Sequence, residues 1–217
     1  MERSLCLVLL LCLCTAAAHA SEWKLSRQDA ARDIRVYLRE TPGTSYNNFY
    51  AVTRVKTRLS TVVAVLSDVP AMPEWIARLR SVKLIKREAD REMWVHSIYK
   101  LPYPFLEREA VLHSILRQEK TGIVEITTRP EKGFIEANPK RVRLLNMSST
   151  WRLTPEKDGV VKIEMWGEGD PGGYVPPMLF NYNLPDEPAQ TLKFLRQMLT
   201  RDKYQKKALA YIREPNT

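Results

Sequence analysis

Side chains able to carry out catalysis or hold a metal are scarce in this chain. His96 and His113 fall in separate predicted strands, at a spacing that does not suit a shared metal ion. The chain lacks the Gly-x-Ser-x-Gly elbow that presents a nucleophilic serine. The glycines of residues 170–173 (DPGG) fit neither a P-loop nor a dinucleotide fingerprint. We therefore expect a protein without enzymatic activity, resident metal or cofactor.

The first twenty residues have the pattern of a cleaved export signal. Arg3 supplies a positive charge, and residues 5–14 (LCLVLLLCLC) form an apolar run too short to span a bilayer as a stable helix. Residues 18–20 (AHA) are a small-x-small cleavage signal before Ser21. All three cysteines lie in this segment, so the mature chain would form no disulfide. We expect an exported protein, periplasmic if its source is a bacterium and otherwise secreted.

Residues 21–217 are expected to form one domain. A mature chain of about 200 residues suits a single domain with a substantial core or a cavity of its own. Its net charge stays at +9, because the removed segment holds one Arg and one Glu. This charge favours anionic partners such as membrane headgroups, nucleic acid or acidic ligands.

Short runs of alternating apolar and polar residues predict a series of β-strands separated by charged or Pro- and Gly-containing turns. The predicted strands are residues 23–25, 34–39, 49–58, 81–87, 93–101, 108–118, 122–129, 141–153 and 160–167. Such a series indicates a curved antiparallel sheet.

Helical periodicity appears in the remaining segments. Residues 60–69 and 73–80 predict two short helices between the third and fourth strands, and residues 176–183 predict another. Residues 186–212 predict a long basic helix with one apolar stripe. Because a strongly curved sheet must cover its concave face, and only this last helix is long enough, the chain predicts an α+β helix-grip fold.

Five short motifs, in order along the chain, resemble those of START domains (StAR-related lipid transfer domains). They are Asp68 with residues 73–75 (PEW), residues 102–109 (PYPFLERE), Arg143, residues 151–155 (WRLTP), and residues 170–176 (DPGGYVP) with Asn181. Glu109 stands where the family usually has aspartate, which keeps the charge. The chain resembles an exported, bacterial-type member of this family, within the helix-grip superfamily.

The resemblance implies an internal cavity for one apolar ligand between the sheet and the last helix. With charged strand positions facing solvent, the inward-facing strand residues and the apolar stripe of the helix would line it. The expected lining residues are Val82, Leu84, Met93, Val95, Ser97, Tyr99, Leu112, Val124, Ile126, Trp151, Leu192, Leu195 and Met198. The same periodicity also fits an ordinary packed core, so periodicity alone does not separate the two.

Arg143 is the polar residue expected in the lining. A buried guanidinium needs a partner, which a lipid phosphate or carboxylate could supply, as could a protein carboxylate such as Glu164. Some sterol-binding members have an acidic partner on the fifth strand, and none is evident here. Arg108 is expected to be structural and to donate hydrogen bonds to backbone carbonyls.

The segment 101–106 (LPYPFL) corresponds, in the resemblance, to a loop beside the cavity mouth. The expected gate or membrane-contact residues are Tyr103, Pro104, Phe105 and Leu106. Tyr103 and Phe105 would insert into a membrane interface while the basic last helix faces anionic headgroups. The alternative is a turn held by two prolines.

Three functions remain open. The leading one is a monomeric, non-enzymatic carrier or sensor of a membrane lipid whose identity the sequence does not give. A cyclase or hydrolase of the same superfamily would need convergent acid and base groups in the pocket. A nucleic-acid-binding protein would need exposed aromatics among its basic residues, whereas Trp75, Trp94 and Trp151 are expected to be buried or lining, and export argues against it.

Overall fold

The structure is a computed structural model, and it describes residues 21–215. The predicted export signal and the three cysteines therefore lie outside the described residues. The described strands are β1 (Lys24–Asp29), β2 (Ile34–Arg39), β3 (Asn48–Lys56), β4 (Leu79–Glu88), β5 (Glu92–Tyr99), β6 (Arg108–Gln118), β7 (Val124–Pro130), β8 (Val142–Arg143), β9 (Met147–Pro155) and β10 (Val160–Gly169). The described helices are η1 (Ala30–Arg32), α1 (Leu59–Leu66), η2 (Val69–Glu74), η3 (Lys157–Gly159), α2 (Pro177–Asn183), α3 (Asp186–Leu199) and α4 (Asp202–Gln205).

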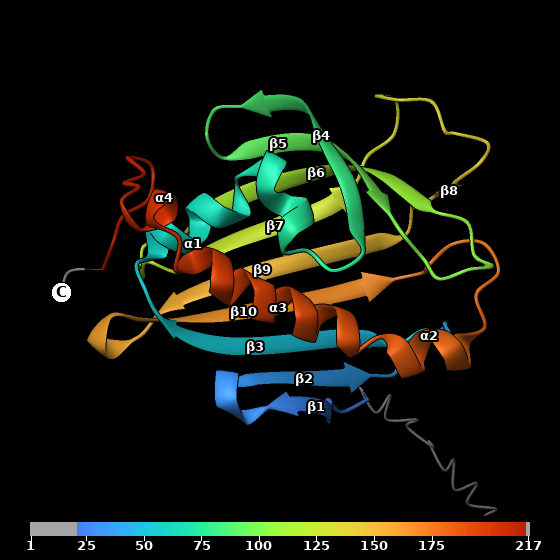
Figure 1. The fold of residues 1–217 in the computed structure, drawn as a ribbon, viewed down its shortest axis with the longest axis horizontal. Helices are drawn as coiled ribbons and strands as arrows, with labels where there is room; N and C mark the ends of the chain where they lie inside the picture. The colour runs from blue at the N-terminus through green and yellow to red at the C-terminus, as the bar shows by residue number, and fades with distance from the viewer. Residues whose placement is uncertain (1–20, 216–217) are drawn as a thin grey trace, which may run out of the picture.

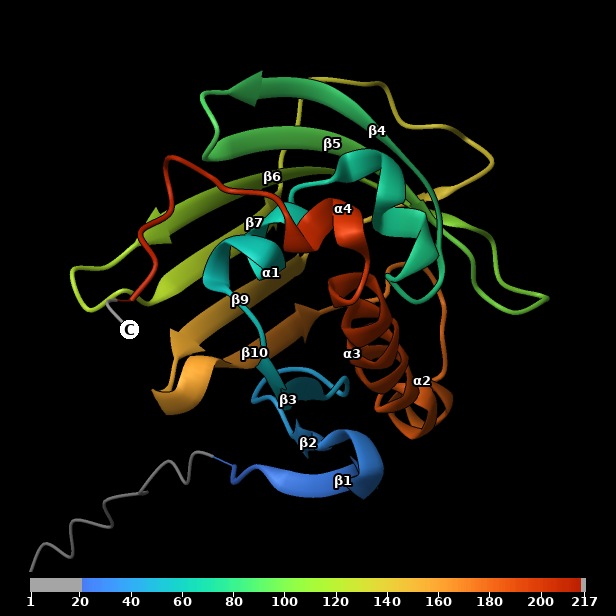
Figure 2. The same cartoon turned by 60° about the vertical axis from the view of Figure 1, so that its left-hand side comes forward.

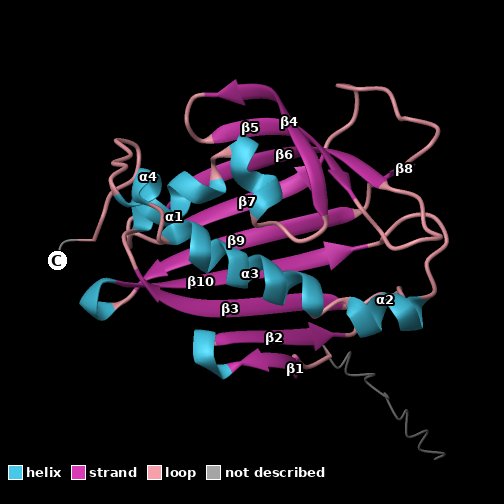
Figure 3. Ribbon diagram, in the orientation of Figure 1, coloured by secondary structure: helices cyan, strands magenta, loops and turns pink. Residues whose placement is uncertain are grey.

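The strands form one sheet in the order β1-β2-β3-β10-β9-β7-β6-β5-β4, and the short β8 pairs with β6. Neighbours along this order are antiparallel, and only β8 pairs in parallel with its neighbour. The sheet curls around α3, while α1 and η2 cover another part of the same concave face (Figures 1 and 2). Figure 3 shows α1, η2 and α3 over this face, whereas η1 and η3 lie in the β1–β2 and β9–β10 connections. The predicted α+β helix-grip fold is confirmed.

Three boundaries differ from the sequence prediction. The second short helix is the 3₁₀ helix η2, which ends at Glu74 because the chain turns sharply before β4, with Arg78 at a positive φ. The single strand expected at 141–153 is two strands, because β8 pairs with β6 and β9 pairs with β7 and β10. The long helix ends at Leu199, and the chain then turns into α4.

Apolar packing is concentrated at the end of the sheet covered by α1. All eight residues of α1 are buried. The last two turns of α3 bury Leu195, Met198 and Leu199 against this region, and Tyr204 of α4 is buried beside them. This end of the molecule is therefore a solid core.

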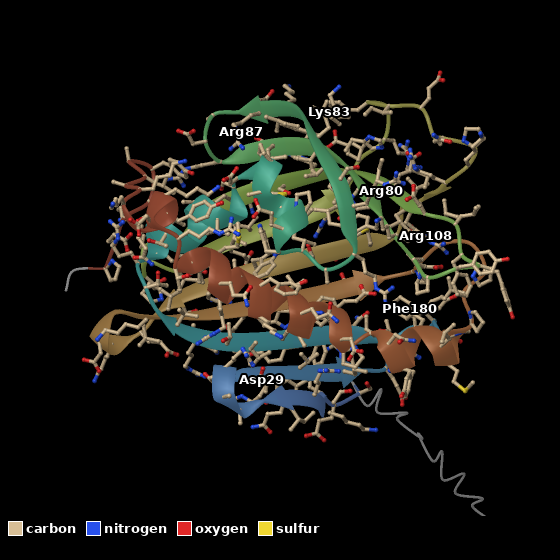
Figure 4. All side chains as sticks on the ribbon, in the orientation of Figure 1. Asp29, Arg80, Lys83, Arg87, Arg108 and Phe180 are labelled. Atoms are coloured by element: carbon tan, nitrogen blue, oxygen red, sulfur yellow. The ribbon has the colours of Figure 1, made fainter. Side chains whose placement is uncertain are left out.

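The edge strand β4 carries a row of basic side chains, of which Arg80, Lys83 and Arg87 are labelled in Figure 4. Charges on an edge strand discourage pairing with another chain. Among the helices that the structure describes, none combines the length and apolar composition needed to cross a membrane.

Candidate functional site

A cavity of about 700 Å³ lies between the concave face of the sheet and its helical cover. This volume falls within the range of small-molecule and cofactor sites, roughly 300–1,000 Å³. The sheet contributes a largely apolar wall that includes Met93, Val95, Leu112, Ile126, Trp151 and Met165. The cover consists of the segment from Met72 to Leu79, the β5–β6 loop, α2 and the first turns of α3.

The structure places seven of the expected lining residues in the cavity wall. They are Met93, Val95, Ser97, Tyr99, Leu112, Ile126 and Trp151. In β5 they alternate with Trp94, His96 and Ile98, because successive strand residues point to opposite faces of the sheet. The register inferred from the charged positions is therefore the observed one for this strand.

Six other expected lining residues lie outside the wall. Val82 and Leu84 belong to the edge strand β4, where Leu84 is 41 % exposed and a register shift follows it. Val124 is fully buried at the packed end of the sheet. Leu192, Leu195 and Met198 are buried in the same packed core as α1. The helix presents Glu187, Pro188 and Thr191 to the cavity instead, because these residues lie in the N-terminal half of α3, whereas the same face of its later turns packs into the core.

Arg143 also lies away from the cavity, contrary to its expected place in the lining. Arg143 in β8 is the register partner of Glu109 in β6, and its side chain lies on the convex face of the sheet. Its Nη2 is 2.9 Å from Glu109 Oε1, and it also donates to the carbonyls of Ile135 and Glu136. Its carboxylate partner is therefore Glu109 on the sixth strand and not Glu164.

Glu109 is the centre of this convex-face network. Its side chain is 1 % exposed, and Oε1 accepts from Arg143 and from the backbone N–H of Asn138 (2.7 Å), while Oε2 lies 3.2 Å from His96 Nε2. Burial alone would raise the pKa of Glu109, but the hydrogen bonds from Asn138, Arg143 and His96 outweigh it and leave the pKa below its ordinary value. The network fastens residues 131–141 over the sheet.

The rim of the cavity is held by Arg108, as expected. This side chain is 3 % exposed and donates to the carbonyls of Leu106 (2.5 Å), Pro171 (2.9 Å) and Gly172 (2.7 Å). Gly172 has φ +66°, and a Cβ there would lie 2.8 Å from Val142 Cγ1, so the turn requires glycine. Arg108 thus joins the β5–β6 loop to the turn that precedes α2.

The two rim segments joined by Arg108 expose large apolar and aromatic side chains. Tyr103 of the β5–β6 loop is 96 % exposed, and Tyr174, Met178 and Tyr182 on and before α2 are each more than 80 % exposed. Both segments lie at one end of the molecule, and α4 lies at the opposite end (Figure 1). Figure 4 labels Arg108 and Phe180 at the rim end.

The expected gate residues divide between the cavity wall and the exposed surface. Tyr103, Pro104 and Phe105 border the cavity, and Leu106 is half-exposed beside it. The basic residues expected to accompany them, such as Lys203 of α4 and Lys206 directly after it, lie at the far end of the molecule (Figure 1). Sequence reasoning missed Met178 and Tyr182, although the apolar and aromatic content of α2 was visible in the sequence.

A curved sheet closed by a helix over a mostly apolar cavity defines a helix-grip ligand-binding protein. The chain belongs to the START domain family, which residues 11–204 match. It is 30 % identical over 179 residues to an uncharacterized protein of Pseudomonas aeruginosa, covering 82 % of this chain and 87 % of that one.

Solved structures agree with this assignment. The STAR-related lipid transfer protein of Xanthomonas axonopodis is 26 % identical, with a TM-score of 0.76 over 82 % of this chain and 99 % of that chain. Human StAR-related lipid transfer protein 5 has the same fold, with a TM-score of 0.70 at 16 % identity over 82 % of this chain and 86 % of that one. The chain is therefore a START-domain protein with the fold of these structures.

Replacing Arg108 with methionine should lower the free energy of unfolding by about 2–3 kcal/mol, because three carbonyls lose a charged hydrogen-bond donor. Urea unfolding followed by circular dichroism measures the change. Arg80→Met is the matched control, since Arg80 forms an exposed ion pair with Glu107 that contributes roughly 0–1 kcal/mol. Equal losses in the two variants would contradict the structural role of Arg108.

Glu109→Gln should lower the free energy of unfolding by about 3 kcal/mol at pH 7, because it removes one partner of a buried ion pair. The folded-state pKa of Glu109 is lowered, so the carboxylate stabilises the fold above its unfolded pKa, roughly 4.3. That contribution is lost as the pH falls through the lower folded value. The stability difference from wild type should therefore narrow below about pH 4. The exposed Glu136→Gln serves as control, and a pH-independent difference would refute the assignment.

Proposed function

We propose that this protein binds one membrane lipid in its cavity and carries it between membranes, without catalysing a reaction. The observation that carries the proposal is the cavity of about 700 Å³ with a mainly apolar wall. Moving apolar ligand surface out of water contributes roughly 25 cal/mol per Å². This contribution is sufficient to drive binding without a covalent step.

The placement of the ionisable groups supports a carrier rather than a cyclase or hydrolase. His96 pairs with Glu109, and His113 pairs with Glu92 and Glu131, on the face of the sheet opposite the cavity. In the wall, Arg108 donates to backbone carbonyls, and Glu187 is paired with Arg78. A general acid and base converging on a bound substrate would need a different arrangement.

The burial of the tryptophans argues against a nucleic-acid platform. Trp75, Trp94 and Trp151 are all buried, and Trp75 packs edge-on against Trp151 with ring centroids 6.0 Å apart. Stacking of bases would require exposed rings among the basic residues. The net charge of +9 is instead consistent with approach to an anionic membrane surface.

The rim formed by the β5–β6 loop and α2 is our proposed membrane contact. Tyr103, Tyr174, Met178 and Tyr182 are exposed there, beside the part of the cavity bordered by Phe105 and Leu179. Amphipathic aromatic side chains favour the membrane interface. We also propose export through cleavage before Ser21, with a monomer working in the periplasm or outside the cell.

Filling the cavity should abolish lipid binding. Val95→Phe adds a ring to the wall, so lipid that co-purifies with the mature protein should fall at least fivefold in native mass spectrometry. Leu84→Phe is the matched control, because Leu84 is the cross-strand partner of Val95 but lies outside the wall. Circular dichroism checks folding, since overpacking costs about 1–3 kcal/mol. Wild-type protein that never carries lipid, even after incubation with vesicles, would refute the proposal.

Membrane contact through the rim should depend on Tyr174 and Tyr182, which are exposed and lie outside the cavity wall. The double variant Tyr174→Ser/Tyr182→Ser should slow transfer of fluorescent lipid between vesicles about tenfold, while binding of detergent-dispersed lipid stays unchanged. The control Leu25→Ser removes an exposed apolar residue from β1. A larger effect from Lys206→Glu/Lys207→Glu, at the opposite end, would overturn the proposed orientation.

A further inference from the structure

One ion pair projects into the mainly apolar cavity. Arg78, in the turn between η2 and β4, and Glu187, in the first turn of α3, both belong to the cavity wall. Arg78 Nε lies 2.5 Å from Glu187 Oε1. The pair therefore brings together the two parts of the helical cover.

Both side chains of this pair line the cavity. Glu187 keeps 41 % of its side-chain surface open, and yet burial raises its pKa. Burial also raises the pKa of Tyr99, with smaller effects from a hydrogen bond with Ser97 and from the charge of Glu187. Ser97 and Tyr99 line the same cavity, and Tyr99 is the cross-strand partner of Leu79, the residue after Arg78. Ser97, Tyr99, Arg78 and Glu187 are therefore the polar cluster of the wall.

The backbone of Arg78 is held in an unusual conformation. Its φ is +61°, a region that costs a non-glycine residue about 1 kcal/mol or more. The Ala77 N–H donates to Thr191 Oγ1 (3.1 Å), and the Lys100 N–H donates to the carbonyl of Arg78 (2.9 Å). Glycine would adopt this backbone conformation without strain. The presence of arginine here therefore points to a role for its side chain.

The remaining hydrogen-bonding capacity of the pair is open to a ligand. Within residues 21–215, Nη1 and Nη2 of Arg78 donate to no other side chain or carbonyl, and Glu187 Oε2 accepts from none. A hydroxyl can donate to the carboxylate and accept from the guanidinium at once. An anionic head group would instead be repelled by the carboxylate of Glu187, and a cationic head group by the guanidinium of Arg78, with little water to screen either charge.

We propose that the polar cluster binds the uncharged hydroxyl head of the lipid, so that the cavity selects neutral lipid alcohols over anionic lipids. This inference rests on the proposed carrier function. An acylglycerol and a ring alcohol such as a sterol both supply the required hydroxyl. The wall of the cavity would accommodate the apolar body of either one.

Displacement of the neutral dye N-phenyl-1-naphthylamine from the mature protein tests the selection. Hexadecan-1-ol should bind about tenfold more tightly than its methyl ether, which cannot donate a hydrogen bond, and more tightly than palmitate. Arg78→Gly and Glu187→Leu should each reduce the preference for the alcohol over the ether to less than twofold. The Arg78→Gly substitution also removes the strain of a positive φ at residue 78, so we expect this variant to fold.

The control variant is Ala89→Gly, since Ala89 has φ +49° in the β4–β5 turn, outside the cavity wall. It should keep the full preference for the alcohol. Equal binding of alcohol and ether by wild type, or tighter binding of palmitate, would overturn the inference and leave the carrier function standing. Failure of every ligand to displace the dye would instead count against the carrier function. Dipalmitoylglycerol and cholesterol, compared in the same assay, distinguish the two sources of the hydroxyl.

Discussion

The uneven cover of one concave sheet is the physical constraint from which the site follows. Apolar side chains on that face must leave water, and α1 with the last turns of α3 accomplishes this by direct packing at one end. At the other end the cover stands away from the sheet and leaves about 700 Å³. The packed core and the cavity wall are two ends of one apolar surface. A ligand in the cavity would bury the part of that surface that the helices leave uncovered.

The two faces of β6 have different structural roles, because successive side chains along a strand point to opposite faces of the sheet. Arg108 points to the cavity side and fixes the rim through three carbonyls. Its neighbour Glu109 points to the convex side and fastens residues 131–141 through Arg143 and the Asn138 N–H. A single strand therefore sets both the entrance to the cavity and the outer cover of the sheet.

The helical cover of the cavity is polar at the junction between its two parts, the η2–β4 turn and α3. Arg78 and Glu187 pair across the junction between the η2–β4 turn and α3, and Ala77 donates to Thr191 beside them. Elsewhere the cover presents apolar residues such as Ile76, Leu184 and Pro188. Because a desolvated ion pair is costly without further hydrogen bonds, this junction is where the polar end of a ligand would gain most from binding.

The sequence alone determined the order of strands and helices and the register of β5, because alternation and helical periodicity are local properties that burial imposes on a chain. It also predicted the backbone contacts of Arg108. Only the tertiary structure decided which buried residues border the cavity: Leu192 and Met198 have the apolar periodicity expected of wall residues but are buried in the packed core. The partnership of Arg143 with Glu109, and of Arg78 with Glu187, joins segments distant in the chain. No local pattern encodes such a pairing, because it depends on how the sheet curls and where the last helix lies across it.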